Sequence, residues 1–302
     1  MDVSGVAERT AARGKKDFFE RMIVIFLGLL AIGVAFPFYN TLIISFADEA
    51  AVGKQLVYLL PVSIDFSAYK VIFEDSTIVS SFLVSVFITV AGTAASMLIS
   101  TAGAYALSKK DYPGRNFFMN AIVFTMLFSG GLIPFYLTVK NLGLTNTLAS
   151  LILPSLANTF YLIIMINYFR GIPASIEESA KIDGANDILI LVRIIIPVSV
   201  PTIAAISLFY AVDKWNAFYH AMLFMSDPKK YPLQLMLREI LVNYSQMFNS
   251  TAAVSMSVSS KPVYQESLKM AVVVVTALPI LMVYPFIQKY FAKGIMIGSV
   301  KG

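Results

Sequence analysis

The chain has no cysteine and a single histidine, His220, among its 302 residues. Without cysteine it can form no disulfide and no thiolate metal site, and one histidine cannot build a multi-histidine metal centre. Charged residues make up only 14% of the chain, against about 25% in soluble domains. These scarcities exclude thiolate and multi-histidine metal centres and argue against an ordinary soluble domain.

Two catalytic patterns are also missing. No Gly-x4-Gly-Lys-Ser/Thr run is present, so the chain cannot cradle nucleotide phosphates in a P-loop of its own. The acidic residues are scattered, and with one histidine they do not form the acid–base set that a membrane-embedded transferase needs. We therefore expect no catalytic residue and no cofactor on this chain.

Apolar residues dominate what is present: 58% of the chain is hydrophobic and the mean hydropathy is +0.75. A membrane-spanning helix needs roughly 20 mainly apolar residues, and its backbone groups must be satisfied within the segment. Six segments meet this requirement, at residues 22–46, 78–107, 117–139, 148–169, 194–219 and 270–290. The sequence therefore predicts an all-α integral membrane protein with six transmembrane helices and a transmembrane domain over residues 22–292.

The distribution of Lys and Arg predicts the orientation. The net charge of +5 comes from basic residues that fall on one side when six spans alternate, not from one basic face, so nucleic acid is not an expected partner. Short loops rich in Lys and Arg stay in the cytoplasm. Residues 1–21, the segment 173–197 and the tail 293–302 are then cytoplasmic, and the loop 220–269 is extracytoplasmic.

Two spans contain residues that are unusual in a membrane helix. The third carries Gly130, Gly131 and Pro134, which indicate either a helix break that lines a pathway or close packing through small residues. The fourth carries Asn158, whose amide at membrane depth indicates an interhelical hydrogen bond or a ligand contact. The residues leave both alternatives open.

The segment 173–197 is a polar insert between two apolar runs. Ser175 and Glu178 have the spacing of a capping box, and Gly184 suits the left-handed position that ends a helix. Asn186 or Asp187 can cap the helix that follows. The insert is therefore expected to be a short helix across the cytoplasmic mouth, although an ordinary helical hairpin loop would have the same local signals.

The insert also resembles a family signature. Glu178-Ser179-Ala180, three residues, Gly184, nine residues and Ile194-x-Ile196-Pro197 resemble the EAA signature of permease subunits in binding-protein-dependent ABC importers, with Ser179 and Ile196 as mild departures. The stretch 128–134 and the tail 293–302 resemble the second permease of maltose-type importers of oligo- and polysaccharides, including the alginate type. The resemblance runs from about the first span to the last residue.

The resemblance implies an ABC type I importer permease in the bacterial cytoplasmic membrane. Its expected partners are a second, homologous permease, two copies of an ABC ATPase that hold ATP and Mg²⁺, an extracytoplasmic solute-binding protein, the saccharide and membrane lipid. The residues expected to couple to the ATPase are Glu177, Glu178, Ser179, Ala180, Asp183, Gly184 and Pro197. The tail residues expected to contact the ATPase are Gly298, Ser299, Val300, Lys301 and Gly302.

Aromatic faces and polar side chains commonly hold sugars, and the chain offers both near the outer end of the fifth span and after the Gly-Gly break. These candidates for the substrate pathway are Tyr210, Asp213, Lys214, Trp215, Asn216, Phe135, Tyr136 and Asn158. The alternative is a belt of interfacial anchors, which aromatic residues often form at a helix end.

Three rival functions follow from the same residues. An ion-coupled secondary carrier would place buried carboxylates at broken-helix ion sites, and only Asp213 is available. A membrane-embedded enzyme would need the acid–base set that is missing. A structural scaffold would have no use for an ATPase-contacting signature.

Overall fold

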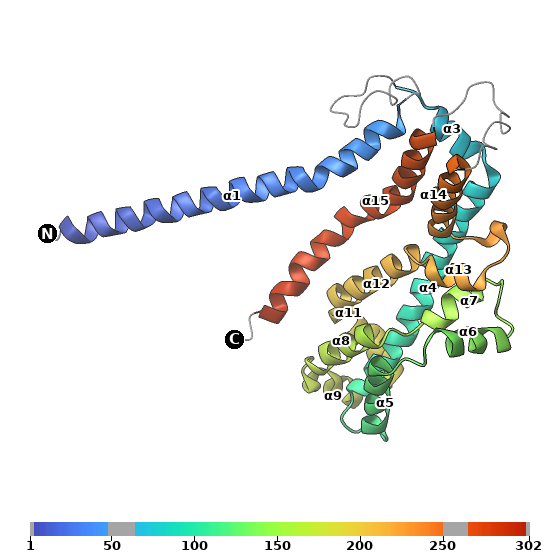
Figure 1. The fold of residues 1–302 in the computed structure, drawn as a ribbon. Helices are drawn as coiled ribbons and strands as arrows, with labels where there is room; N and C mark the ends of the chain where they lie inside the picture. Colours follow the sequence, from blue (N-terminus) through green and yellow to red (C-terminus); the bar gives the residue numbers. More distant parts are fainter. Residues whose placement is uncertain (1–2, 48–63, 250–264, 300–302) are drawn as a thin grey trace. The chain divides into compact units, whose positions relative to one another are not determined.

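The structure is a computed structural model that describes residues 3–47, 64–249 and 265–299 (Figure 1). These residues form helices and turns and contain no strand, as the sequence predicts. The longer helices are α1 (Val3–Ser45), α3 (Ser67–Glu74), α4 (Ser76–Ser108), α5 (Arg115–Leu127), α6 (Leu132–Asn141), α8 (Thr159–Arg170), α9 (Ala174–Ile182), α12 (Val200–Trp215), α14 (Leu233–Asn249) and α15 (Gln265–Ser299). Short ones are α7 (Ala149–Ile152), η1 (Leu153–Ser155), α10 (Asp187–Ile190), η2 (Leu191–Ile195), α11 (Ile196–Val198), α13 (Tyr219–Phe224) and η3 (Pro228–Lys230).

The chain divides into two compact units. The terminal unit comprises residues 1–71 and 254–274, and the core unit comprises residues 72–253 and 275–302.

Three helical stretches are long and apolar enough to cross a membrane unaided: Phe19–Ser45, Ser76–Ser108 and Glu266–Val283. Three further candidates are pairs of helices bent at a short break. The bends are 117° between α5 and α6, 48° between Ala149–Ser155 and α8, and 87° between Asp187–Val198 and α12. The described residues therefore supply up to six spans if each bent pair counts as one, and half of the six predicted segments are broken rather than continuous.

Gly131 forms the sharpest of these breaks. It has φ 85° and ψ 171°, a conformation that is essentially limited to glycine because any side chain would clash with the backbone. An added Cβ at Gly131 would have no neighbour within 4 Å among the described residues, so close packing within this part of the chain does not explain the glycine. Of the two readings of the Gly-Gly stretch, the helix break is confirmed, and whether it lines a pathway stays a prediction.

In the core unit, α4 packs along both α8 and α12. Its buried face carries small residues, which let helix backbones approach closely in a membrane: Ser85, Gly92, Ser96, Ser100 and Ala104. A buried apolar cluster continues from α4 into α8, α9 and α12, and contains Ala104, Met165, Ile166, Ala180 and Ile206. The contact with α9 matters most, because it fixes the polar insert to the membrane helices.

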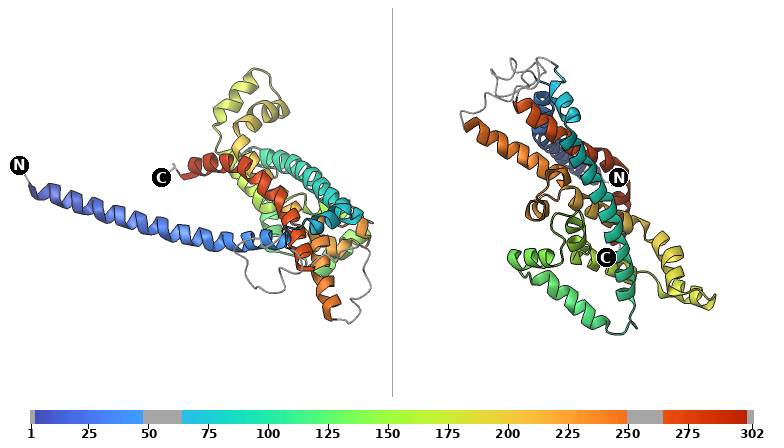
Figure 2. Two further views of the ribbon diagram at one scale, coloured as in Figure 1. Left: turned by 90° about the horizontal axis from the view of Figure 1, so that it is seen from above. Right: turned by 90° about the vertical axis from the view of Figure 1, so that its right-hand side faces the viewer.

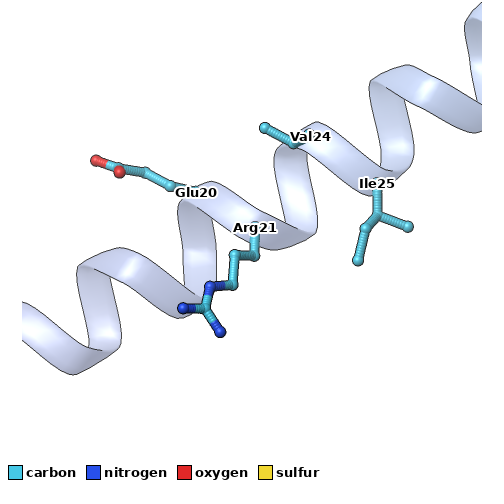
Figure 3. Close-up of a pocket in the computed structure, with 4 residues that line it drawn as sticks. All are labelled: Glu20, Arg21, Val24 and Ile25. Carbon is cyan, nitrogen blue, oxygen red and sulfur yellow. The ribbon is translucent and has the colours of Figure 1, made fainter.

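In the terminal unit, residues 19–39 of α1 are exposed. Figure 3 shows Glu20 and Arg21 one turn before Val24 and Ile25, all four on one helix with no other element opposite them. Val24 and Ile25 are 69% and 62% exposed, so these four residues form the surface of an apolar helix rather than a cleft.

The end of α1 does pack within its unit. The Ser45 hydroxyl and the Tyr69 hydroxyl are hydrogen bonded at 2.7 Å, and the Phe46 and Tyr69 rings stack at 4.9 Å. The Ser267 hydroxyl donates to the carbonyl of Ala47. These contacts tie the end of α1 to α3 and to the start of α15.

Candidate functional site

The polar insert forms α9, which begins two residues earlier than the capping box requires. Pro173 precedes the first helical residue, Ala174, and makes no side-chain capping bond. Ser175 is already inside the helix, where its carbonyl accepts a hydrogen bond from the Ser179 hydroxyl at 2.8 Å. The predicted Ser175–Glu178 capping box is therefore wrong, because a residue inside the first turn cannot occupy the N-cap position.

The end of α9 follows the prediction. Gly184 is left-handed at φ +83°, the Gly184 amide donates to the Lys181 carbonyl at 3.0 Å, and the Ala185 amide donates to the Ala180 carbonyl at 2.9 Å. This pair of bonds is a Schellman motif. The Asn186 side chain then accepts from the Leu189 amide at 2.8 Å and caps α10. Glycine and asparagine thus reverse the chain within three residues.

One side of α9 faces the protein. Ala180 is only 8% exposed and belongs to the buried cluster of α4, α8 and α12. Glu177, on the same side, forms an ion pair with Lys109 at the end of α4. Burial lowers the pKa of Lys109, the positive charge of Lys181 acts in the same direction, and the Asp187 carboxylate opposes both. A buried methyl group and an ion pair therefore hold α9 in place.

The other side of α9 faces away from the protein. Glu178, Ser179, Asp183 and Gly184 are exposed, and Ile182 is 87% exposed. In both views of Figure 2 the yellow-green helices α9 and α10 stand out from the rest of the core unit. A large apolar side chain among polar neighbours on a projecting helix is typical of a protein interaction site.

The segment after α10 connects the insert to the fifth predicted span. Leu191–Ile195 forms a π-helical turn, and Pro197 follows it in α11. Pro197 has no amide hydrogen and its ring crowds the carbonyl one turn earlier, which a wider turn relieves. Pro197 is exposed, so five of the seven predicted coupling residues face outward while Glu177 and Ala180 face the protein.

Sequence reasoning missed the cations that hold the end of α4. The carbonyl of Leu107 accepts from Arg115 Nε at 3.1 Å and from Arg170 at 3.3 Å. Positive charge at a helix C-terminus is stabilising. From the sequence, these basic residues indicate only the orientation in the membrane, because no local signal pairs them with a carbonyl at the end of α4.

The predicted tail contact lies at the edge of the described chain. Gly298 and Ser299 are the last two residues of α15, and Val300, Lys301 and Gly302 lie outside the described residues.

Some of the pathway candidates line a cavity of about 630 Å³ inside the core unit, between α4, α8, α12 and α15. Its lining is mainly apolar, with Asp213 as the charged member. The Asp213 carboxylate accepts a hydrogen bond from the Tyr161 hydroxyl at 2.8 Å. Trp215 lies beside this cavity and donates its indole N–H to the Thr276 carbonyl at 3.2 Å. Within the described part of the chain, no three His, Asp or Glu side chains could share a metal ion.

Other candidates already use their polar groups within the protein. The Tyr210 hydroxyl is hydrogen bonded to the Ser100 hydroxyl, Lys214 donates to the carbonyl of Ser155, and the Asn158 side chain caps α8 through the amides of residues 160 and 161. Asn216 is exposed, and its side-chain oxygen accepts from Gln234 at 3.4 Å.

Phe135 and Tyr136 belong to a separate aromatic cluster between α6 and α13. Phe135 lies 5.4 Å from His220 and 5.6 Å from Phe224, and Tyr136 stacks on Phe224 at 6.0 Å. Burial lowers the pKa of His220, and the positive charge of Lys214 acts in the same direction. The structure therefore separates the candidates into a cavity beside α12, a hydrogen-bonded group around Tyr210 and Lys214, and this cluster.

Comparison with known proteins extends over nearly the whole chain, although no protein-family model matches it. The chain is 47% identical, over 95% of its length and 100% of the relative, to the polygalacturonan/rhamnogalacturonan transport system permease protein YtcP of Bacillus subtilis (strain 168). It is 44% identical to the protein LplC of the same organism, over 94% of this chain and 95% of LplC.

A solved structure agrees with these relatives. A chain in the crystal structure of a bacterial ABC transporter involved in import of the acidic polysaccharide alginate is 36% identical, with a TM-score of 0.85, and the match covers 92% of this chain and 98% of that one. Identity at this level over this length decides between the transport classes that the residues left open. The protein belongs to the carbohydrate permeases of ABC importers, integral proteins of the bacterial cytoplasmic membrane.

Proposed function

We propose that this permease imports acidic oligosaccharides, namely oligouronides, as one half of a pair of homologous permeases. Support comes from the names of two relatives, since polygalacturonan and alginate are both polymers of uronic acids. The solute-binding protein would deliver the sugar from outside, and alternating access would release it into the cytoplasm.

We further propose that α9 is the element that docks on a separate ATPase, which holds ATP and Mg²⁺. The single observation that carries this proposal is the 87% exposure of Ile182 on a helix whose opposite side is fixed by Ala180 and Glu177. When a partner covers an apolar side chain that is exposed to this extent, the removal of its surface from water lowers the free energy of the complex. Glu178, Ser179, Asp183 and Gly184 would surround that contact, and residues 298–302 would add a second one.

The anchoring of α9 explains how force would reach the membrane helices. Ala180 belongs to the buried cluster to which α4, α8 and α12 contribute, and Glu177 pairs with Lys109 at the end of α4. When ATP binding closes the ATPase, displacement of α9 would therefore move α4 directly rather than fold a loose loop. The π-helical turn and Pro197 would transmit the same movement to α12.

The test is affinity purification of the tagged chain from its native membrane, followed by an ATPase assay with the solute-binding protein. We expect a second permease and an ATPase to co-purify. We expect oligogalacturonate or oligoalginate to stimulate hydrolysis, and a neutral oligosaccharide of the same length to have no effect. Equal stimulation by the neutral sugar would contradict the uronide assignment, and a chain recovered without any ATPase would contradict the docking role.

A variant pair tests α9 itself. Ile182→Glu should release the ATPase while the permease pair stays assembled. Tyr112→Glu, which places the same carboxylate on the exposed turn after α4, is the matched control and should retain the ATPase. Retention of the ATPase by Ile182→Glu would show that α9 is not the docking element.

A further inference from the structure

The fourth predicted span is interrupted over residues 156–158, where it bends by 48°. A break in a membrane helix frees carbonyl groups on its N-terminal side and amide groups on its C-terminal side. The bilayer core offers these groups no water, so other parts of the protein must satisfy them. The side chains that do so determine the geometry of the break.

Lys214 satisfies the carbonyl side. Its ammonium donates to the carbonyl of Ser155 at 2.9 Å, to the Ser155 hydroxyl at 2.5 Å and to the carbonyl of Ile152 at 3.5 Å. An ammonium has three donors, so all three are directed at the end of this half-helix. Its positive charge also faces the negative end of the helix dipole. Lys214 therefore acts as a cap supplied by another helix.

The surroundings of Lys214 are shaped for this contact. The side chain is only 4% exposed, and its stem passes over Gly92 of α4, where an added Cβ would lie 3.2 Å from two of its carbons. Among the described residues Lys214 forms no ion pair, and the neighbouring carboxylate of Asp213 accepts a hydrogen bond from Tyr161. The polar partners of this buried cation are thus the groups at the break.

Tyr210 satisfies the other side of the break. Its hydroxyl accepts a hydrogen bond from the amide of Asn158 at 2.9 Å and is bonded to the Ser100 hydroxyl at 2.8 Å. Asn158 in turn caps α8 with its own side chain. Tyr210 and Lys214 are four residues apart, so they lie on one face of α12. One face of one helix therefore holds both ends of the break.

We propose that Tyr210 and Lys214 are positioning residues for translocation, which fasten both sides of the broken fourth span to α12 so that these segments move as one body. Neither residue is then a sugar ligand. Release of Lys214 toward a sugar would leave the carbonyl of Ser155 unpaired at membrane depth, which is unfavourable, and would leave the carbonyl of Ile152 with the Ser155 hydroxyl as its remaining donor. The effect on transport rests on the proposed import function, whereas the contacts themselves do not.

The transport test uses the complete importer in proteoliposomes, with Lys214→Met and Tyr210→Phe. We expect the maximal rate to fall about tenfold and KM to change by less than about twofold, the pattern of an interaction that serves turnover rather than sugar binding. More ATP should be consumed per sugar. A KM raised more than about tenfold at an unchanged maximal rate would identify a ligand and overturn the proposal. Lys140→Met and Tyr112→Phe, at exposed or partly exposed positions, are the matched controls.

A second measurement does not depend on transport. Hydrogen–deuterium exchange over residues 156–161, in nanodiscs, should be faster in both variants than in the wild type and the controls, because the break loses its partners. Unchanged exchange would overturn the proposal even if transport falls. If no sugar is imported by any form, the proposed function fails while the exchange result still decides the role of these residues.

Gly92→Ala is the variant to use if Lys214→Met does not assemble. The added methyl group crowds the stem of Lys214 and leaves its charge intact. We expect faster exchange and a lower maximal rate, as for Lys214→Met, but with smaller changes in both. Normal exchange in Gly92→Ala would show that the position of the ammonium is not what holds the break.

Discussion

The ammonium of Lys109 contacts the carboxylate of Glu177 and so joins the end of α4 to α9 across 68 residues of sequence. The same ammonium lies 4.0 Å from the centre of the Tyr105 ring. The two side chains are 26% and 19% exposed, so the pair is only partly screened by water. It is the polar half of the anchor whose apolar half is Ala180.

Loss of this pair should weaken the link between α9 and α4. For Lys109→Met we expect a loss of about 1 kcal/mol, which corresponds to about a fivefold change in the population of docked α9. The consequence should be more ATP hydrolysed per sugar imported, measured on the complete importer. Lys110→Met, at the exposed neighbouring position, should leave that ratio unchanged.

The double variant Lys109→Glu with Glu177→Lys should bring the ratio of ATP hydrolysed to sugar imported part of the way back to the wild-type value, because it restores a pair of opposite charges. If the single variants couple as well as the wild type does, the pair has no part in transmission.

Ala180 should tolerate no larger side chain. Ala180→Leu inserts a branched chain at a position that is 8% exposed, so we expect a loss of about 1–3 kcal/mol from overpacking. Ser179→Leu, one residue earlier and exposed, should change stability by less than about 0.5 kcal/mol. Thermal unfolding of the purified chain in detergent measures both, and equal stabilities would mean that Ala180 is not packed against the membrane helices.

Substitution by alanine should destabilise the protein more at Gly131 than at Gly130. Gly131→Ala forces a side chain into a glycine-only conformation at φ 85°, which should cost about 1–3 kcal/mol. Gly130 is not among the described residues with positive φ, so Gly130→Ala should have a smaller effect. Thermal unfolding of the two variants compares them directly, and the reverse order would contradict the observed break.

His220 should make stability depend on pH. Its pKa in the folded chain is lowered by burial and by Lys214, so the neutral form is favoured. The stabilisation is complete above the ordinary value of about 6.5, and decreases as the pH falls from there through the lowered pKa. The unfolding temperature of the wild type should therefore drop between about pH 7 and pH 5.

His220→Phe keeps a ring beside Phe135 and Phe224 and removes the titrating group. Since His220 is the sole histidine of the chain, the variant should lose most of the slope in this pH window. An identical slope in the variant would assign the pH dependence to other groups.

Turns, caps and helix ends were predictable from the sequence where neighbouring residues alone determine them. Gly184 and Asn186 turn and cap the chain as predicted, because both act through backbone groups within five residues. The second predicted span, 78–107, agrees with α4 to within two residues at each end. The predicted capping box at Ser175 was wrong for an equally local reason. The helix has Pro173 as its N-cap, and a sequence pattern does not distinguish start positions that differ by one or two residues.

The candidate site was less predictable. The sequence marked Tyr210, Lys214 and Asn158 as polar residues at membrane depth, which made them candidates for a sugar pathway. Their observed partners lie 52 to 110 residues away in the sequence or, for Asn158, in the next turn of its own helix. A buried polar group takes whichever partner the packing brings to it.

By itself the sequence predicted an all-helical membrane protein with a polar insert turned at Gly184 between two apolar segments, and the motif in this insert resembled that of ABC importer permeases. It could do so because the bilayer sets the length of a span, and because Gly184 and its neighbours act over a single turn. Only the tertiary structure decided that three predicted spans are bent pairs of helices, and that Lys214 and Tyr210 hold one of the bends. The reason is that a broken helix is stable only where a distant element supplies its missing hydrogen bonds, and that partner is chosen by packing in three dimensions.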